Sequence, residues 1–138
     1  MLVAKGNIWT YDADWRIITT NGFVKNNGEA VMGRGVAWQA REKFPGLALR
    51  FGEYLNQKGN HVGIFEDIKL ITMPVKHHWI DDASLKLIER SALELTSLPY
   101  DATFVLPRPG CGNGRLLWPD VKAVIEQHLD DRFTVLEF

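Results

Sequence analysis

The chain has 138 residues, of which 46% are hydrophobic and 24% charged, an ordinary composition for one folded domain and not for a disordered chain. Its 16 basic and 17 acidic residues give a net charge of −1, which argues against a broad electrostatic grip on nucleic acid. The apolar runs are too short for a membrane-spanning helix, and the first residues lack the apolar core of an export signal. We therefore expect one cytoplasmic domain over residues 1–138, monomeric and without a membrane partner.

Glycine, proline and asparagine divide the first half of the chain into two strands, a loop and two helices. Residues 2–5 and the β-branched residues 15–20 predict strands. Residues 23–35 are rich in glycine and asparagine, which favours a loop. Helical spacing of apolar residues then predicts helices over residues 36–44 and 47–57.

The second half alternates more regularly between strands and helices. Its expected elements are strands over residues 61–65 and 69–75, a helix over 84–98, a strand over 103–106, a glycine-rich loop over 107–115, a helix over 119–129 and a strand over 133–138. Asp81, Asp82 and Ser84 offer caps for the helix that starts at residue 84. Strands that alternate with helices indicate an α/β fold with a mixed sheet covered on both faces. Ligands of such sheets bind beyond the carboxyl ends of the strands.

Two glycine-rich loops, residues 21–35 and 107–115, each follow a strand and lead into a helix. Glycine allows a ligand to approach the backbone, and free N–H groups at a helix start favour an anion. The two loops could hold two phosphates or one diphosphate, although glycine loops as often only make turns. Neither loop has the spacing of a P-loop or of a dinucleotide fingerprint, which excludes both of those classes.

Four segments, in chain order, resemble the macro domains, which bind ADP-ribose. Residues 6–8 (Gly-Asn-Ile) are similar to an early Gly-Asp-Ile element, and Asn21 lies where the family has an asparagine. Residues 32–37 (MGRGVA) resemble the first glycine-rich loop of the family. Residues 106–118 (LPRPGCGNGRLLW) are very similar to a segment of one branch, found in phages and bacteria as well as in eukaryotes. That branch contains the terminal ADP-ribose protein glycohydrolase and the antitoxin macro domains that remove ADP-ribose from DNA.

The resemblance implies a three-layer α/β/α macro domain whose two glycine-rich loops clasp the diphosphate and distal ribose of ADP-ribose. It implies no cofactor. The implied ligand-binding residues are Asn7, Ile8, Asn21, Gly33, Arg34, Gly35, Val36, Ala37, Pro109, Gly110, Cys111, Gly112, Asn113, Gly114 and Arg115. Most of them would act through backbone N–H groups, so freedom of the backbone matters more than the side chains.

Lys76 and Asn21 are the implied catalytic residues. Lys76 lies in a segment, residues 74–79, that resembles the Pro-Thr-Lys-x-His-Trp of the DNA-directed antitoxins, where the matching lysine is catalytic. A lysine can attack the anomeric carbon C1″ through an imine, or it can act as an electrostatic and proton-transfer aid. A protonated amine is a poor nucleophile, so attack requires the neutral form. Asn21 could bond the hydroxyls of the distal ribose, or it could be an ordinary Asn-Gly turn residue.

Two positions depart from the family pattern. The eukaryotic glycohydrolase has a catalytic aspartate after its Gly-Cys-Gly, and Gly114 stands at that position here. Asn7 replaces the early aspartate that accepts a hydrogen bond from the adenine amino group, so one charge is lost there.

Other chemistry-bearing residues predict less. Cys111 is the only cysteine, which excludes an internal disulfide, and we expect it to be a small loop residue rather than a reactive thiol. His77 and His78 lack further ligands at metal spacing, so no metal site is expected. The five tryptophans are expected mostly in the core.

Three functions stay open at this point. The first is a hydrolase that removes ADP-ribose from a macromolecule, either DNA or protein, with Lys76 as the key residue. The second is an ADP-ribose-1″-phosphate phosphatase that uses the same pocket. The third is a non-catalytic reader of ADP-ribose, an option that the absence of an acid at Gly114 favours.

Overall fold

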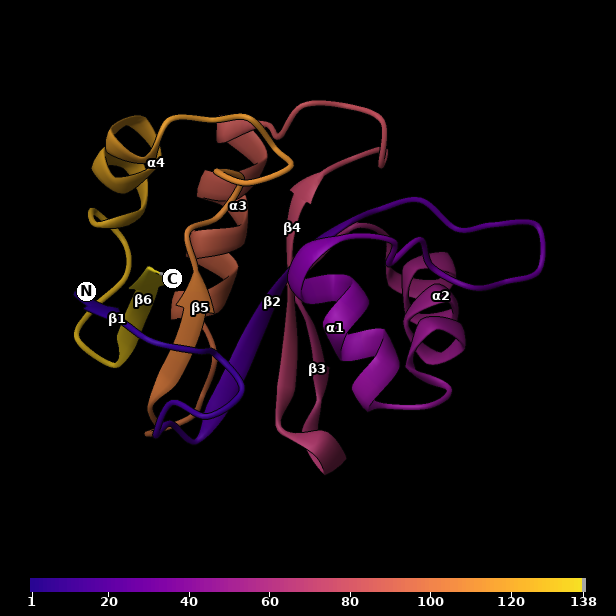
Figure 1. The fold of residues 1–138 in the computed structure, drawn as a ribbon, viewed down its shortest axis with the longest axis horizontal. Coiled ribbons are helices and arrows are strands. Elements are labelled where there is room, and N and C mark those ends of the chain that lie inside the picture. The colour runs from indigo at the N-terminus through magenta and orange to yellow at the C-terminus, as the bar shows by residue number, and fades with distance from the viewer. Residues whose placement is uncertain (138) are drawn as a thin grey trace.

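The computed structural model describes residues 1–137 and contains one six-stranded sheet with helices on both faces (Figure 1). The strands are β1 (Leu2–Lys5), β2 (Trp15–Asn21), β3 (Gly63–Phe65), β4 (Leu70–Lys76), β5 (Phe104–Pro107) and β6 (Phe133–Glu137). The helices are α1 (Gly35–Lys43), α2 (Leu47–Lys58), α3 (Leu85–Thr96) and α4 (Trp118–Ile125), with a 3₁₀ turn, η1 (Glu66–Ile68).

The strand order is β1-β6-β5-β2-β4-β3, and only β3 runs antiparallel to its neighbour. The inner strands β4 and β5 are mostly apolar because parallel strands covered on both faces bury most of their side chains. In β4, residues 70–75 are buried, and in β5 all four residues are. The expected α/β class with a mixed sheet is confirmed.

Each face of the sheet has its own core. Helices α3 and α4 pack on one face, where Ile88, Ala92 and Val121 meet the sheet. Helices α1 and α2 cover the other face through Ala40 and Phe51. Figure 1 shows the two helix pairs on opposite sides of the strands. No helix within the described residues is long and apolar enough to cross a membrane.

The element boundaries differ from the predictions by one or two residues in most elements, and two of the differences have a visible cause. The helix expected over residues 119–129 ends at Ile125 and a turn follows, in which the His128 N–H donates to the Ile125 carbonyl at 3.0 Å, three positions back instead of the four of an α-helix. The strand expected from residue 61 begins at Gly63, because the Val62 N–H donates to the Glu94 carboxylate at 2.9 Å. The predicted last strand is confirmed through residue 137; Phe138 lies outside the described residues.

The prediction that the tryptophans are mostly core holds for three of the five, since Trp9 and Trp118 pack half-buried against the core clusters beside the buried Trp15. The other two, Trp38 and Trp79, are exposed to 45% and 49%. Tryptophan has a large apolar body, yet its exposure depends on which loop or helix face carries it, which the sequence does not state.

Candidate functional site

The carboxyl ends of three neighbouring strands border a cavity of about 730 Å³. These strands, β2, β4 and β5, end at Asn21, Lys76 and Pro107, all of which line it. The position beyond the strand ends agrees with the general rule for ligand sites in α/β sheets. The volume falls within the range of pockets that enclose a nucleotide-sized molecule, about 300–1,000 Å³.

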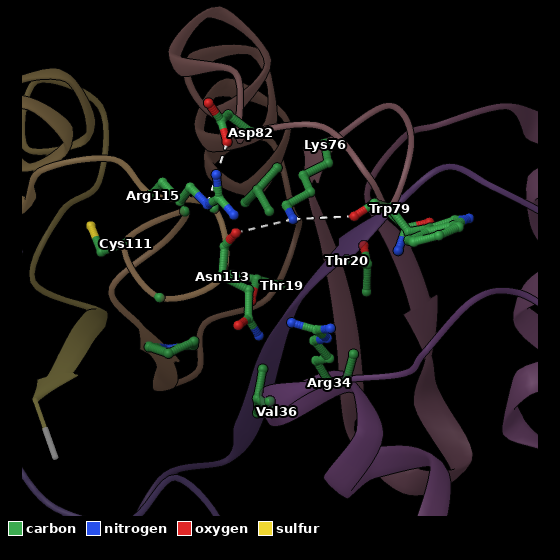
Figure 2. Close-up of a pocket in the computed structure, with 18 of the residues that line it drawn as sticks. Thr19, Thr20, Arg34, Val36, Lys76, Trp79, Asp82, Cys111, Asn113 and Arg115 are labelled. Atoms are coloured by element: carbon green, nitrogen blue, oxygen red, sulfur yellow. Dashed lines mark hydrogen bonds and ion pairs between the residues drawn. The ribbon is translucent and has the colours of Figure 1, made fainter.

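Most of the residues predicted from the sequence come together around this cavity. They are Asn21, Gly33, Arg34, Gly35, Val36, Ala37, Lys76, Gly110, Cys111, Gly112, Asn113, Gly114 and Arg115. Figure 2 shows several of them pointing into the space between the two loops. The two glycine-rich loops, about 75 positions apart in sequence, therefore form one site.

The N-terminus of α1 is a place for an anion. The first hydrogen bond of the helix runs from the Trp38 N–H to the Arg34 carbonyl at 3.2 Å, so helix geometry leaves the three preceding N–H groups without a helical partner. No side chain within residues 1–137 caps this end. Gly35 has a φ of 57° and faces the Asn113 side chain, where its missing Cβ keeps the backbone accessible. A phosphate bound here gains both the N–H groups and the helix dipole.

The second loop is a tight turn with no spare volume at two of its glycines. Gly110 has a φ of 74°, and a Cβ there would lie 2.8 Å from Ile88 Cδ1. A Cβ on Gly114 would lie 2.5 Å from the Gly110 carbonyl oxygen and 2.7 Å from Ala83 Cβ. Gly112, by contrast, has nothing within 4 Å. An aspartate at position 114 is therefore incompatible with this backbone, and the absence of that acid is built into the loop.

Lys76 connects the two sides of the cavity. Its Nζ donates to the Asn113 carbonyl at 3.2 Å and to the Trp79 carbonyl at 3.4 Å, as the dashed lines in Figure 2 show. The side chain is half-buried, and its backbone carbonyl accepts a hydrogen bond from Asn60 Nδ2 at 3.0 Å. The amine is thus held at a defined place in the cavity instead of moving freely in solvent.

Asn21 pairs with Lys76 across β2 and β4, where a register shift interrupts the ladder. Its Nδ2 donates to the Val31 carbonyl at 3.0 Å, and its Oδ1 accepts from the Phe23 N–H at 2.9 Å. The carboxamide therefore fastens the ends of the loop between β2 and α1. This contact matches the turn interpretation of Asn21, while its place on the cavity keeps the side chain within reach of a ligand.

Three predicted residues are not brought to the cavity. Asn7 is exposed, and its Oδ1 accepts from the Trp9 N–H at 2.8 Å in a local turn. Ile8 is fully buried and packs with Val105 and Leu136. Pro109 is buried within the second loop. Their contacts with a ligand stay predictions.

Several residues that line the cavity were not predicted as site residues, and Asp81 and Asp82 were expected only as helix caps. Asp81 and Asp82 line the cavity, and Ser84 alone caps α3, accepting from the Leu87 N–H at 3.2 Å. Glu137, at the end of β6, also lines the cavity, and its Oε2 lies 3.3 Å from a guanidinium nitrogen of Arg108. The β4–α3 connection could have been predicted to line the cavity, because it begins directly after Lys76 at the carboxyl end of a strand.

Cys111 and Thr20 differ in how they meet the cavity. Burial raises the pKa of the Cys111 thiol, so the thiol is protonated at neutral pH, and its sulfur points away from Lys76 in Figure 2. This agrees with a loop residue rather than a reactive thiol.

The hydroxyl of Thr20, a buried residue of the cavity lining, has no hydrogen-bond partner within residues 1–137; the residue is 5% exposed. No group of three or more potential metal ligands occurs in the described part of the chain.

Comparison with solved structures defines the class: the chain has the macrodomain fold. The DarG macrodomain of Mycobacterium tuberculosis superposes with a TM-score of 0.78 at 20% identity, covering 99% of this chain and 97% of that one. The DarG macrodomain of Thermus aquaticus gives a TM-score of 0.78 at 23% identity, with 98% and 95% covered. DarTG of Thermosipho africanus, solved with ADP-ribose, gives 0.80 at 19% identity over 97% of this chain and 40% of that one.

One curated relative matches in sequence, a DNA ADP-ribosyl glycohydrolase of Thermus aquaticus. It is 26% identical over an alignment of 116 positions that covers 75% of this chain and 32% of the relative. The chain thus spans about a third of the length of that relative. No family model matches the sequence.

Proposed function

We propose that the cavity binds ADP-ribose and that the protein hydrolyses the bond between ADP-ribose and a DNA base. The observation that carries this proposal is the placement of Lys76, whose amine is fixed between the two loops that would hold the ligand. The free N–H groups at the start of α1 supply a site for the diphosphate. The relatives support the substrate, because one is a DNA ADP-ribosyl glycohydrolase and another was solved with ADP-ribose.

The chemistry would take place at C1″ of the distal ribose. In its neutral form the Lys76 amine attacks C1″, the bond from C1″ to the base breaks, and the base leaves with a proton. The C1″–O4″ bond of the resulting glycosylamine then breaks, one proton moves from the nitrogen to O4″, and the opened ribose is held as an imine. Water hydrolyses the imine, and the ribose ring closes again as ADP-ribose and the free amine are released. The alternative, in which Lys76 only supplies charge and a proton, forms no covalent adduct. Reduction with borohydride during turnover separates the two, since only an imine is trapped as a stable adduct on Lys76.

The Lys76→Ala variant tests the proposal. We expect it to lower the rate of ADP-ribose release from a modified oligonucleotide by about 10²–10⁴-fold or more, and to change the affinity for free ADP-ribose only a few-fold. Lys86→Ala, at an exposed position of α3 outside the cavity, is the matched control and should keep full activity. Turnover that survives in Lys76→Ala contradicts the role of Lys76.

Three substrates separate this function from the alternatives. ADP-ribosylated single-stranded DNA, an ADP-ribosylated peptide and ADP-ribose-1″-phosphate are assayed side by side with the wild-type protein. Release from DNA supports the proposal, whereas phosphate release alone identifies a phosphatase. Binding without any turnover identifies a reader. We also propose a cytoplasmic location for the protein, because it would have to reach modified bases in genomic DNA.

A further inference from the structure

Three aromatic side chains form a cluster on the rim of the cavity, which we name the rim aromatics: Phe23, His78 and Trp79. The ring centroids of Phe23 and His78 are 4.4 Å apart, and those of His78 and Trp79 are 5.5 Å apart. Phe23 comes from the loop after β2 and the other two from the loop after β4, so two loops build the cluster. Trp79 is the member that lines the cavity.

Backbone contacts hold this cluster in place. The Gly22 N–H donates to the His77 carbonyl at 3.2 Å, which ties the two loops together. The Ile80 N–H donates to His78 Nδ1 at 3.2 Å and fixes that ring. The Trp79 backbone carbonyl accepts from Lys76 Nζ at 3.4 Å, so the backbone that carries the indole is tied to the proposed catalytic amine.

The rim aromatics are nevertheless open to solvent. Trp79 is 49% exposed and Phe23 36% exposed, and the adjacent Ile80 is 70% exposed. Large apolar side chains that are both immobilised and exposed at the mouth of a cavity mark a surface for a ligand. The rigid aromatic plane offers a stacking partner that loses little conformational entropy on binding.

We propose that Trp79 stacks on an unpaired base of the DNA strand, next to the base that carries ADP-ribose. This inference rests on the proposed function. With ADP-ribose in the cavity and C1″ at Lys76, the attached nucleotide must leave over the rim where the indole lies. Every base has a π-face that such a side chain can receive, whereas the bases of a duplex are already stacked on each other. The occupant is therefore single-stranded DNA.

The low net charge of the protein favours stacking on a DNA base, and not attraction to the DNA phosphates, as the source of binding. The net charge is −1, and the cationic Arg115 near the rim is paired with Asp82 at 3.8 Å. A protein that held the strand through phosphates would carry a cationic surface and a steep dependence on salt. We therefore expect the contribution of Trp79 to depend only weakly on salt between 50 and 200 mM, the range over which about six to ten phosphate contacts would lose about 10³–10⁵ in affinity.

The test compares a modified oligonucleotide with a modified mononucleoside as substrates. In Trp79→Ala, KM for the oligonucleotide should rise about tenfold or more relative to KM for the mononucleoside, with Trp79→Phe restoring most of the difference. Trp38→Ala is the matched control, because Trp38 is similarly exposed at 45% but lies on α1 outside the cavity lining. It should leave both KM values unchanged.

A second measurement changes the DNA substrate. Replacing the base beside the modified nucleotide with an abasic site should raise KM of the wild-type protein as much as Trp79→Ala does, and the two changes combined should add little. Equal KM values for oligonucleotide and mononucleoside in the wild type overturn the inference. So does an ADP-ribosylated peptide that loses as much from Trp79→Ala as the oligonucleotide. If the wild type neither binds ADP-ribose nor cleaves any of these substrates, the proposed function falls as well.

Discussion

At the scale of single residues, Gly114 marks a position of the cavity where an acidic side chain does not fit. The matching aspartate of the eukaryotic glycohydrolase has no room here, since its Cβ would lie 2.5 Å from the Gly110 carbonyl oxygen. If the reaction needs a carboxylate, the candidates already in the cavity are Asp81 and Asp82, from the β4–α3 connection, and Glu137, from the end of β6.

Gly114→Asp should therefore destabilise the protein instead of improving catalysis. Overpacking at this point should lower the free energy of unfolding by about 1–3 kcal/mol. Gly112→Asp, in the same loop but with nothing within 4 Å of a Cβ, is the control and should change stability by only about 0.5 kcal/mol. Urea denaturation of both variants measures the difference. Equal stability of the two would show that the loop can move to accept a side chain.

Residue patterns predicted the two loops and Lys76, but not the aromatic rim. Lys76 was found because its neighbours match a motif, and the glycines because the backbone needs them. The exposure of Trp79 could not be predicted, since a tryptophan is by default a core residue and only the path of the loop brings it to the surface. Glu137 was missed because its place beside Arg108 depends on the strand order, which puts β6 next to β5.

At the scale of elements, the start of α1 should be essential for the ligand. In Gly35→Val the backbone is strained and the β-branched side chain stands in the path of the phosphate, so the Kd for ADP-ribose should rise roughly tenfold to hundredfold or more. Gly46→Val is the control, because Gly46 has a φ of 85° at the start of α2 and lies outside the cavity.

Calorimetric titration of both variants with ADP-ribose measures this effect. Both substitutions carry a similar strain of about 1–2 kcal/mol, so a difference between them reports the ligand and not the fold. Retained affinity in Gly35→Val would refute the assignment of α1 to the diphosphate.

The entry to β2 is fastened to β5 by a carboxylate. Asp14 Oδ2 accepts from the Thr103 N–H at 2.8 Å and from its hydroxyl at 3.1 Å, and these bonds lower the pKa of Asp14 below its ordinary value of 3.8. A carboxyl whose pKa is lower in the folded state stabilises above its unfolded pKa, and this contribution is lost as the pH falls through the folded pKa.

Asp14→Ala should thus reduce stability at pH 7, and its difference from the wild type should shrink on acidification below about pH 4. Urea denaturation at several pH values measures this difference. The exposed neighbour Asp12 supplies the control variant, Asp12→Ala, which should follow the wild-type curve. A difference that stays constant with pH would show that Asp14 acts through packing and not through its charge.

At the scale of the whole molecule, ligand binding should stabilise the fold. ADP-ribose at 100 times its Kd should add about 2.7 kcal/mol to the free energy of unfolding, which corresponds to a rise of several degrees in Tm. A thermal denaturation series with ADP-ribose, ADP and AMP measures it. An equal rise with AMP would mean that the distal ribose contributes nothing and that the cavity recognises adenosine alone.

The sequence predicted the α/β class and the order of strands and helices well, because strong periodicity and glycine punctuation mark each element. Strand order in the sheet was not predicted, since it depends on contacts between distant residues. The late start of β3 was also missed, because the Val62 N–H donates to Glu94, 32 positions away, and such a bond leaves no local pattern. The helix end at Ile125 was missed because the turn that follows it, residues 126–129, contains no glycine or proline to mark it.

Strands β1 and β6, which come first and last in the chain, are neighbours in the sheet, with Leu2 opposite Thr134. The cavity is lined by residues from Thr19 to Glu137, so it draws on most of the chain. During synthesis, β2 and β4 leave the ribosome well before β5, the other neighbour of β2, so the half of the cavity that carries Lys76 exists first without the Asn113 carbonyl that holds its amine. A nascent chain cannot close around ADP-ribose until the second loop has emerged. Ligand capture by ribosome-bound chains of increasing length would then report the completion of folding, as a sharp onset and not as a gradual rise.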